Sequence, residues 1–171
     1  CLAIFQEIGD RRGIMLTYTN LSHSYNESGE YTEALQCGLN ALTYGCDANL
    51  QDVVAITYIN VGRSYKEMKA FTEAHFYLEK ALTVASATGN ALVKLFAHWD
   101  LGRLAQIQHD PALALVYLQT ALQEATEQEQ KLYQYEVHHV LSELYDQLHD
   151  PAAALAHFRT FHMIRDEVVS L

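Results

Sequence analysis

The feature that most constrains the fold is a pattern that recurs along the chain with a period of 40 and without a gap. At the same place in each unit an apolar residue is followed by a small one, and three of the four units have a tyrosine three positions later. The members of this series are Leu21-Ser22-x-x-Tyr25, Val61-Gly62-x-x-Tyr65, Leu101-Gly102-x-x-Ala105 and Leu141-Ser142-x-x-Tyr145. Alanines recur with the same period at Ala34, Ala74, Ala114 and Ala154, and again at Ala41, Ala81 and Ala121. A fixed period of this size indicates an array of stacked structural units.

Within each unit the apolar residues have helical spacing. Phe71, Ala74, Leu78 and Ala81 lie three or four positions apart, which is typical of one face of a helix. A short break separates this helix from the one before it, and the four breaks lie at 27–31, 67–71, 108–112 and 148–152. Each unit is therefore predicted to be a helix, a tight turn and a second helix, with about 16 residues in each helix.

Two of the breaks carry a signal for the start of the second helix. Asp110 precedes Pro111, and Asp150 precedes Pro151. Aspartate favours the N-cap, and proline suits the first helical position, where its missing N–H removes no hydrogen bond. We expect a helix to begin at each proline.

The small residues predict how the two helices of a unit pack. Gly62 on the first helix and Ala74 on the second would let the two backbones approach closely. Tyr65, Phe71 and Leu78 would fill the space around this contact. We expect a layered array in which each unit buries its apolar face only against its neighbours.

Composition and motifs narrow the functional classes. The chain has 171 residues and a formal charge of −10, which argues against nucleic acid as a partner. No apolar run approaches the roughly 18 residues that a membrane span needs, so no membrane insertion is expected. The three cysteines have no metal-binding spacing and indicate free thiols in a reducing, cytoplasmic compartment. Catalytic motifs are lacking and the histidines are poorly spaced for chelation, so we expect no enzyme activity, no metal and no cofactor.

The recurring small residues, tyrosines and alanines resemble the tetratricopeptide repeat family over essentially the whole chain. The resemblance implies an all-α fold, a right-handed α-solenoid of antiparallel helix hairpins. The family's usual period is about 34 residues, so the longer period seen here implies longer helices. This long form is similar to the repeats of kinesin light chains and of many bacterial signalling proteins. Ala105 departs from the pattern, because it replaces the aromatic residue in the third unit.

The phase of the repeat sets the predicted boundaries. Residues 1–10 match the end of a preceding repeat's second helix, and the whole chain is predicted to be one array. The four repeats are predicted at 11–50, 51–90, 91–130 and 131–171, the last including a terminal helix. We therefore expect an earlier unit before Cys1 and a different element after Leu171. Residues 158–167 resemble the segment that leads from bacterial repeat arrays into a signalling output domain.

The resemblance also implies a binding surface. In this family the first helices of the repeats line a concave groove, and the residues carried over to that groove are Asn20, His23, Asn60, Arg63, Lys66, Phe96, Trp99, Arg103 and His139. Asparagine amides can hold the backbone of an extended peptide, and arginine suits a carboxylate. We expect a protein or peptide ligand that is acidic or has a free C-terminal carboxylate. The alternative is that the asparagines cap or bridge neighbouring helices and that Arg63 and Arg103 pair with Glu67 or Asp100 on a solvated face.

Two functions remain open from the sequence. The first is a non-catalytic scaffold that binds a protein or peptide as the regulatory or sensory part of a larger signalling protein. The second is an oligomerisation or coupling module that controls an attached cyclase or kinase without a peptide ligand. For the second function, a homodimer would form through the terminal helix, near Phe158, Phe161 and Ile164.

Overall fold

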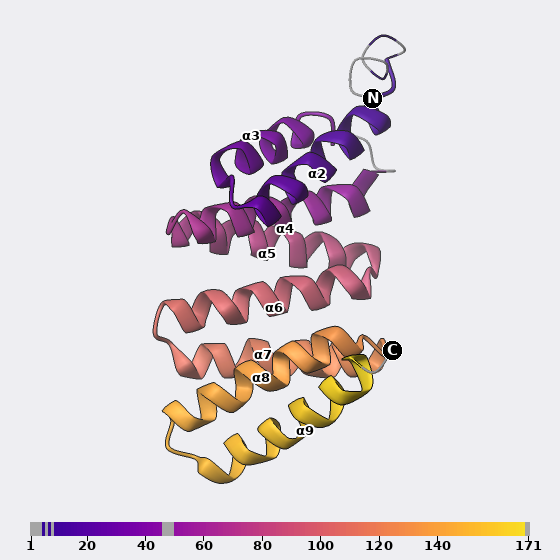
Figure 1. Cartoon of the computed structure of the whole chain (residues 1–171). Helices are drawn as coiled ribbons and strands as arrows, with labels where there is room; N and C mark the ends of the chain where they lie inside the picture. Colours follow the sequence, from indigo (N-terminus) through magenta and orange to yellow (C-terminus); the bar gives the residue numbers. More distant parts are fainter. Residues whose placement is uncertain (1–4, 6, 8, 46–49, 170–171) are drawn as a thin grey trace. The chain divides into compact units, whose positions relative to one another are not determined.

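The computed structural model describes residues 5, 7, 9–45 and 50–169, and the side chains up to Glu167 (Figure 1). Eight helices are described, and no strand lies among these residues. The helices are α2 (Arg11–Ser28), α3 (Tyr31–Leu42), α4 (Gln51–Glu67), α5 (Phe71–Thr88), α6 (Ala91–Ile107), α7 (Pro111–Glu127), α8 (Lys131–Gln147) and α9 (Pro151–Val169). Except for α3, each has 17 to 19 residues, close to the predicted length.

The chain divides into two compact units, Cys1–Asp100 and Leu101–Leu171, and the boundary lies within α6. In unit 1, α2 pairs with α3 and α4 pairs with α5, while α4 also packs on α2 and α3. In unit 2, α8 lies beside α9 and against α7 (Figure 1). The all-α repeat solenoid predicted from the sequence is confirmed, and each predicted repeat range contains one pair of helices.

The predicted close contacts between helices are present. A Cβ atom added at Gly62 would lie 2.7 Å from Cγ of Leu78 and 3.4 Å from the carbonyl oxygen of Ala74. At the equivalent place in the next repeat, a Cβ atom added at Gly102 would meet Leu118 at 2.8 Å. Ser22 holds the same place in the first repeat, where its hydroxyl donates to the carbonyl of Ala34 at 2.8 Å. Only a small residue fits here, because the facing helix is already in van der Waals contact.

The turn inside each hairpin repeats one backbone conformation. A residue just after the first helix has a positive φ, between 59° and 81°, at Gly29, Lys69, His109 and His149. The next residue then donates its N–H to a carbonyl five positions earlier, as in Asp150 N to Tyr145 O at 2.9 Å. This is the Schellman arrangement that satisfies the last carbonyls of a helix. Three of the four residues are not glycine, so each carries the strain of a left-handed conformation.

Aspartates cap the second helices as predicted. The Asp110 carboxylate accepts from the N–H of Leu113 and the Asp150 carboxylate from that of Ala153, both at 3.0 Å. Asp10 does the same for α2, with Gly13 as the donor.

Part of the predicted N-terminal helix end, residues 1–4, 6 and 8, lies outside the described residues. The described part has a turn like the others, since Gly9 has a φ of 69° and Asp10 N donates to Phe5 O. None of the described helices is long and apolar enough to cross a membrane.

Candidate functional site

Polar side chains join the first helices of neighbouring hairpins in unit 1. The hydroxyls of Thr19 on α2 and Thr57 on α4 lie 2.8 Å apart and are buried. Asn60 is 2% exposed, and its amide donates to the Thr19 carbonyl at 3.1 Å. Asn26 donates to the Asn60 carbonyl and accepts from Ser64, both at 2.9 Å. Hydrogen bonds of this kind satisfy buried polar groups and fix the register of the two helices.

The structure therefore gives Asn60 the bridging role that was the alternative in the sequence interpretation. Its side chain is used between α4 and α2 and is covered. Asn20, its equivalent in α2, is exposed, as is His23 one turn later.

A buried carboxylate on α6 binds two cations on α4. Asp100 is 2% exposed, and it accepts from Nε of Arg63 at 2.6 Å and from Nζ of Lys66 at 3.1 Å. Burial alone would raise the pKa of Asp100, but the charges and hydrogen bonds of Arg63 and Lys66 lower it overall. The aspartate is thus ionised at neutral pH. Lys66 also lies 3.6 Å from Glu67 at the surface.

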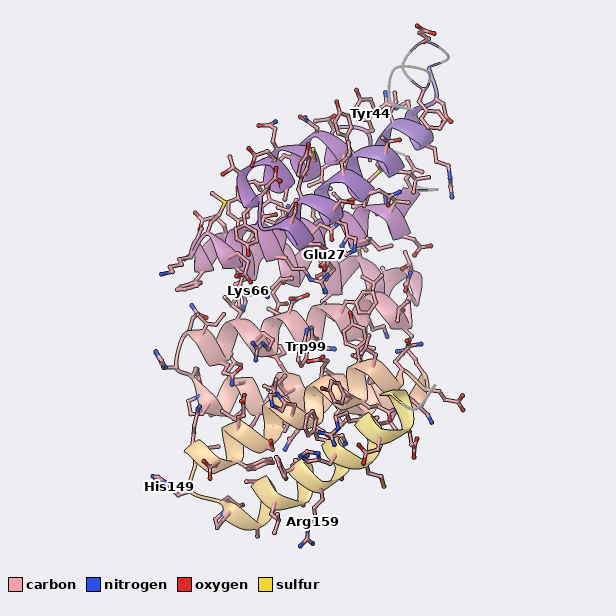
Figure 2. The ribbon with its side chains drawn as sticks, in the orientation of Figure 1. Glu27, Tyr44, Lys66, Trp99, His149 and Arg159 are labelled. Atoms are coloured by element: carbon pink, nitrogen blue, oxygen red, sulfur yellow. The ribbon has the colours of Figure 1, made fainter. Side chains whose placement is uncertain are left out.

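The remaining predicted residues are partly exposed. In unit 1, Phe96 and Trp99 on α6 are half-buried, and Figure 2 labels Trp99 and Lys66. In unit 2, Arg103 is half-buried and donates to Gln106 at 2.9 Å. His139 belongs to a groove on α8 and α9.

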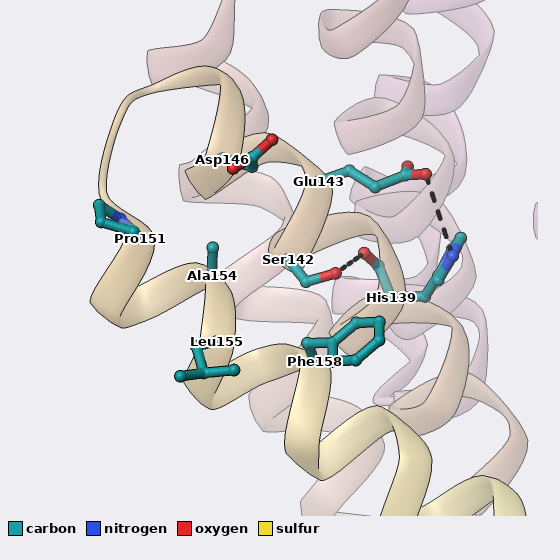
Figure 3. A pocket seen from close by; sticks show the side chains of 8 residues that line it. All are labelled: His139, Ser142, Glu143, Asp146, Pro151, Ala154, Leu155 and Phe158. Carbon is teal, nitrogen blue, oxygen red and sulfur yellow. Dashed lines mark hydrogen bonds and ion pairs between the residues drawn. The ribbon is translucent and has the colours of Figure 1, made fainter.

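A groove lies between α8 and α9 in unit 2. It has a volume of about 430 Å³, and Figure 3 shows its lining of His139, Ser142, Glu143, Asp146, Pro151, Ala154, Leu155 and Phe158. We call this surface the α8–α9 groove. The α9 residues form an apolar side, and the α8 residues form a polar side with two carboxylates.

The groove is only lightly organised by interactions of its own. Nε2 of His139 lies 3.9 Å from Glu143, and the Ser142 hydroxyl donates to the His139 carbonyl at 2.7 Å (Figure 3). Phe158 is 48% exposed, and Leu155 is equally so. The apolar side is thus open to a ligand, and large exposed apolar surfaces of this kind mark interaction sites.

The three residues of α9 that were predicted to form a self-association surface differ in exposure. Phe158, Phe161 and Ile164 were predicted together as a self-association surface, but Phe161 and Ile164 are buried. The ring of Phe161 stacks on Tyr135 with centroids 4.7 Å apart, and it lies at the same distance from His139. Only Phe158 of the three is exposed.

A pair of histidines between α8 and α9 was not foreseen. Nδ1 of His138 and Nδ1 of His157 lie 2.8 Å apart, and the His157 ring stacks on Tyr145. Burial and the neighbouring His157 lower the pKa of His138 to about 4, and burial lowers that of His157. The pair is neutral at pH 7, with one ring donating and the other accepting.

The fold defines a class of protein, an all-α helical repeat array. Comparison with family models matched the tetratricopeptide repeat over residues 13–87. Residues 13–87 are thus similar to tetratricopeptide repeats, and the described helices have the all-α repeat fold of the solved structures that match. The comparison with curated proteins gave no significant match.

Solved structures share the fold at low sequence identity. BtubC (BKLC) from P. vanneervenii matches with a TM-score of 0.82 and 20% identity, over 95% of this chain and 67% of that one. A Rap protein complexed with Competence and Sporulation Factor matches with a TM-score of 0.73 and 15% identity, over 99% and 57%. The apo form of RapI matches with a TM-score of 0.72 and 16% identity, over 99% and 75%. The chain therefore spans little more than half of the Rap complex's protein chain.

Proposed function

We propose that this chain is a non-catalytic recognition module and that the α8–α9 groove binds a segment of a partner protein. The observation that carries the proposal is the open apolar side of the groove. Leu78 and Leu118 hold the place of Phe158 in the two preceding repeats, and both are 0% exposed. Phe158 is 48% exposed and larger. Exposed aromatic anchors of this kind dominate binding energy at interfaces.

A displayed library of 17-residue helical peptides tests this function directly. Peptides selected on the 171-residue protein should bind at least tenfold more weakly to Phe158→Glu, because a charge would then occupy the apolar side of the groove. Phe76→Glu is the matched control, since Phe76 is 52% exposed on α5 of unit 1. Selected peptides that bind both variants equally well would contradict the proposal.

The surface predicted from the sequence on α2, α4 and α6 is a second candidate, for an extended acidic peptide. Arg63 and Lys66 lie beside Asp100, and Phe96 and Trp99 are half-buried on α6, the helix of Asp100. Arg63→Glu is a poor test because it would place a second carboxylate beside buried Asp100. The double variant Asn20→Ala, His23→Ala changes exposed residues instead. If its affinity for a peptide selected on this surface were unchanged, the two residues would not belong to the binding site. Arg103→Glu tests the equivalent position in unit 2.

We also propose that the module regulates a larger cytoplasmic signalling protein. The support is the likeness to a Rap protein complexed with Competence and Sporulation Factor, of which this chain spans 57%. Joining the array to the rest of its polypeptide and measuring the output with and without a selected peptide would test this role. An output that ignores a saturating peptide would contradict it.

A further inference from the structure

The repeats of unit 1 show what normally covers the surface that is open on α8 and α9. Gly38 on α3 is the equivalent of Phe158, and a Cβ atom added there would come within 2.5 Å of Val61 on α4. Asn26 on α2 is the equivalent of Asp146, and its side chain bonds to Asn60 and Ser64, also on α4. The first helix of the following hairpin therefore lies over this surface in unit 1.

The next repeat shows how that covering helix is recognised by charge. Arg63 and Lys66 on α4 are the equivalents of Glu143 and Asp146, and both bind Asp100 on α6. Two residues of one hairpin thus hold a residue of opposite charge at one defined position of the next first helix. In α8 both members of this pair are acidic, so the charge required of the covering helix is reversed.

We infer that the α8–α9 groove takes an amphipathic α-helix of a partner protein that carries a lysine or arginine at the position equivalent to Asp100. This inference rests on the proposed function and specifies its ligand. The apolar face of the helix would pack on Ala154, Leu155 and Phe158, and its basic residue would lie between Glu143 and Asp146.

A second copy of this chain does not fit the charge requirement. The residues equivalent to Asp100 in the other first helices are Asn20, Asn60 and Val140, so no described first helix presents a cation there. The exposed face of α2 would place Asn20, a neutral amide, against the two carboxylates. Attraction between opposite charges that are partly withdrawn from water discriminates between partners more than it adds affinity.

The chain supplies its own probes for a test. A synthetic peptide of residues 91–107, the sequence of α6, carries Asp100, the residue that Arg63 and Lys66 bind, and the D100K peptide reverses its charge. Each peptide is stapled on its exposed face, because isolated helices of this length are marginal in water. The protein variant Glu143→Arg with Asp146→Lys recreates the pair found at Arg63 and Lys66.

Titration of both peptides into both proteins gives four affinities. The unmodified protein should bind the D100K peptide about tenfold more tightly than the Asp100 peptide, which corresponds to one charge pair of about 1.4 kcal/mol. The charge-reversed protein should show the opposite preference. Both preferences should shrink when the salt rises from about 50 mM to about 500 mM.

The same preference in both proteins, or no preference in either, would overturn the inference. If binding then remains sensitive to Phe158→Glu, the proposed function survives with a different ligand. If neither peptide binds and peptides selected from the library also ignore Phe158→Glu, the proposed function fails as well. Sedimentation of the unmodified protein adds one outcome, since a dimer that Phe158→Glu dissociates would make a second copy the occupant and overturn the inference.

Discussion

Hairpins α4–α5 and α8–α9 are equivalent units of the repeat, yet the same two positions of their first helices have different surroundings. On α4, Arg63 and Lys66 are engaged with a carboxylate that is buried on the following first helix. On α8, the equivalent Glu143 and Asp146 line an open groove. The difference teaches that equivalent positions of a repeat can pack against a following helix in one hairpin and line an open groove in another. The two hairpins also differ in the charge at these two positions and in the size of the apolar residue at 78 and 158.

Removing the buried carboxylate should give the largest effect. Asp100→Ala leaves Arg63 and Lys66 beside an apolar gap, and breaking a buried ion pair by deleting one partner costs about 3 kcal/mol. Urea unfolding would measure the loss. Asp52→Ala is the control, because Asp52 is exposed and accepts a hydrogen bond from the amide of Asn90 at the surface. This control should change the free energy of unfolding by less than about 0.5 kcal/mol. Equal losses in the two variants would show that the ion pairs of Asp100 contribute no more to the free energy of unfolding than a surface hydrogen bond.

Filling the close helix contact should be nearly as costly. Gly62→Val would drive a branched side chain into Leu78 and the backbone at Ala74, and overpacking of this kind costs about 2 kcal/mol. Ser142 holds the same place in α8 but borders the groove, so Ser142→Val should cost less than half as much. Thermal unfolding of the two variants would compare them, and equal losses would mean that α8–α9 is packed as tightly as α4–α5.

Acidification should weaken α8–α9 and leave α4–α5 unaffected. The folded state lowers the pKa of His138 to about 4 and also lowers that of His157, so protons bind the unfolded state first. Stability is full above the unfolded pKa of about 6.5 and is lost as the pH falls toward the folded values. We expect a loss of about 1 kcal/mol between pH 7 and pH 5, discounted for partial exposure.

Hydrogen exchange of the α8 and α9 amides at the two pH values, corrected for intrinsic rates, would locate that loss. His138→Phe should abolish most of it, whereas changing exposed His75 on α5 to phenylalanine should not. A uniform loss over α4 and α5 as well would assign the effect to other groups.

The turns should give the smallest effects. His149→Gly removes left-handed strain at a φ of 60° and should stabilise the fold by about 0.5 kcal/mol, after the entropy cost of glycine in the unfolded chain. Gly29→Ala, with a φ of 81°, should destabilise it by about 1 kcal/mol. Figure 2 labels His149 at the turn between α8 and α9. Chemical denaturation would resolve these changes, and equal signs would contradict the assignment of strain.

Much of the fold could be predicted from the sequence because its information is local and repeated. The period of 40 places the helices, and aspartate before proline places two of their starts. The turn conformation was harder to predict. Only Gly29 indicates a positive φ by its residue type, whereas Lys69, His109 and His149 do not. In those three the backbone hydrogen bonds of the turn override the residue's own preference.

The candidate site was predicted less completely, because it depends on how helices cross. His139 was predicted for a groove lined by the first helices, and it lies in the α8–α9 groove, whose apolar side from α9 was not predicted. Asp100 was considered as a partner of the arginines, and nothing in its residue type indicated that it would be buried, since aspartate is mostly exposed. The contact between His138 and His157 spans 19 residues and two helices, so no local pattern encodes it.

The ion cluster of Asp100 also bears on whether these repeats can be exchanged. Arg63 and Lys66 favour a following helix with a carboxylate at one position. If hairpin α8–α9 preceded α6 in the place of α4–α5, Glu143 and Asp146 would face Asp100, and three negative charges would share one site. The charges at these positions therefore determine which hairpin can precede α6. An array with exchanged hairpins would assemble only if the complementary residue of the following helix were exchanged as well.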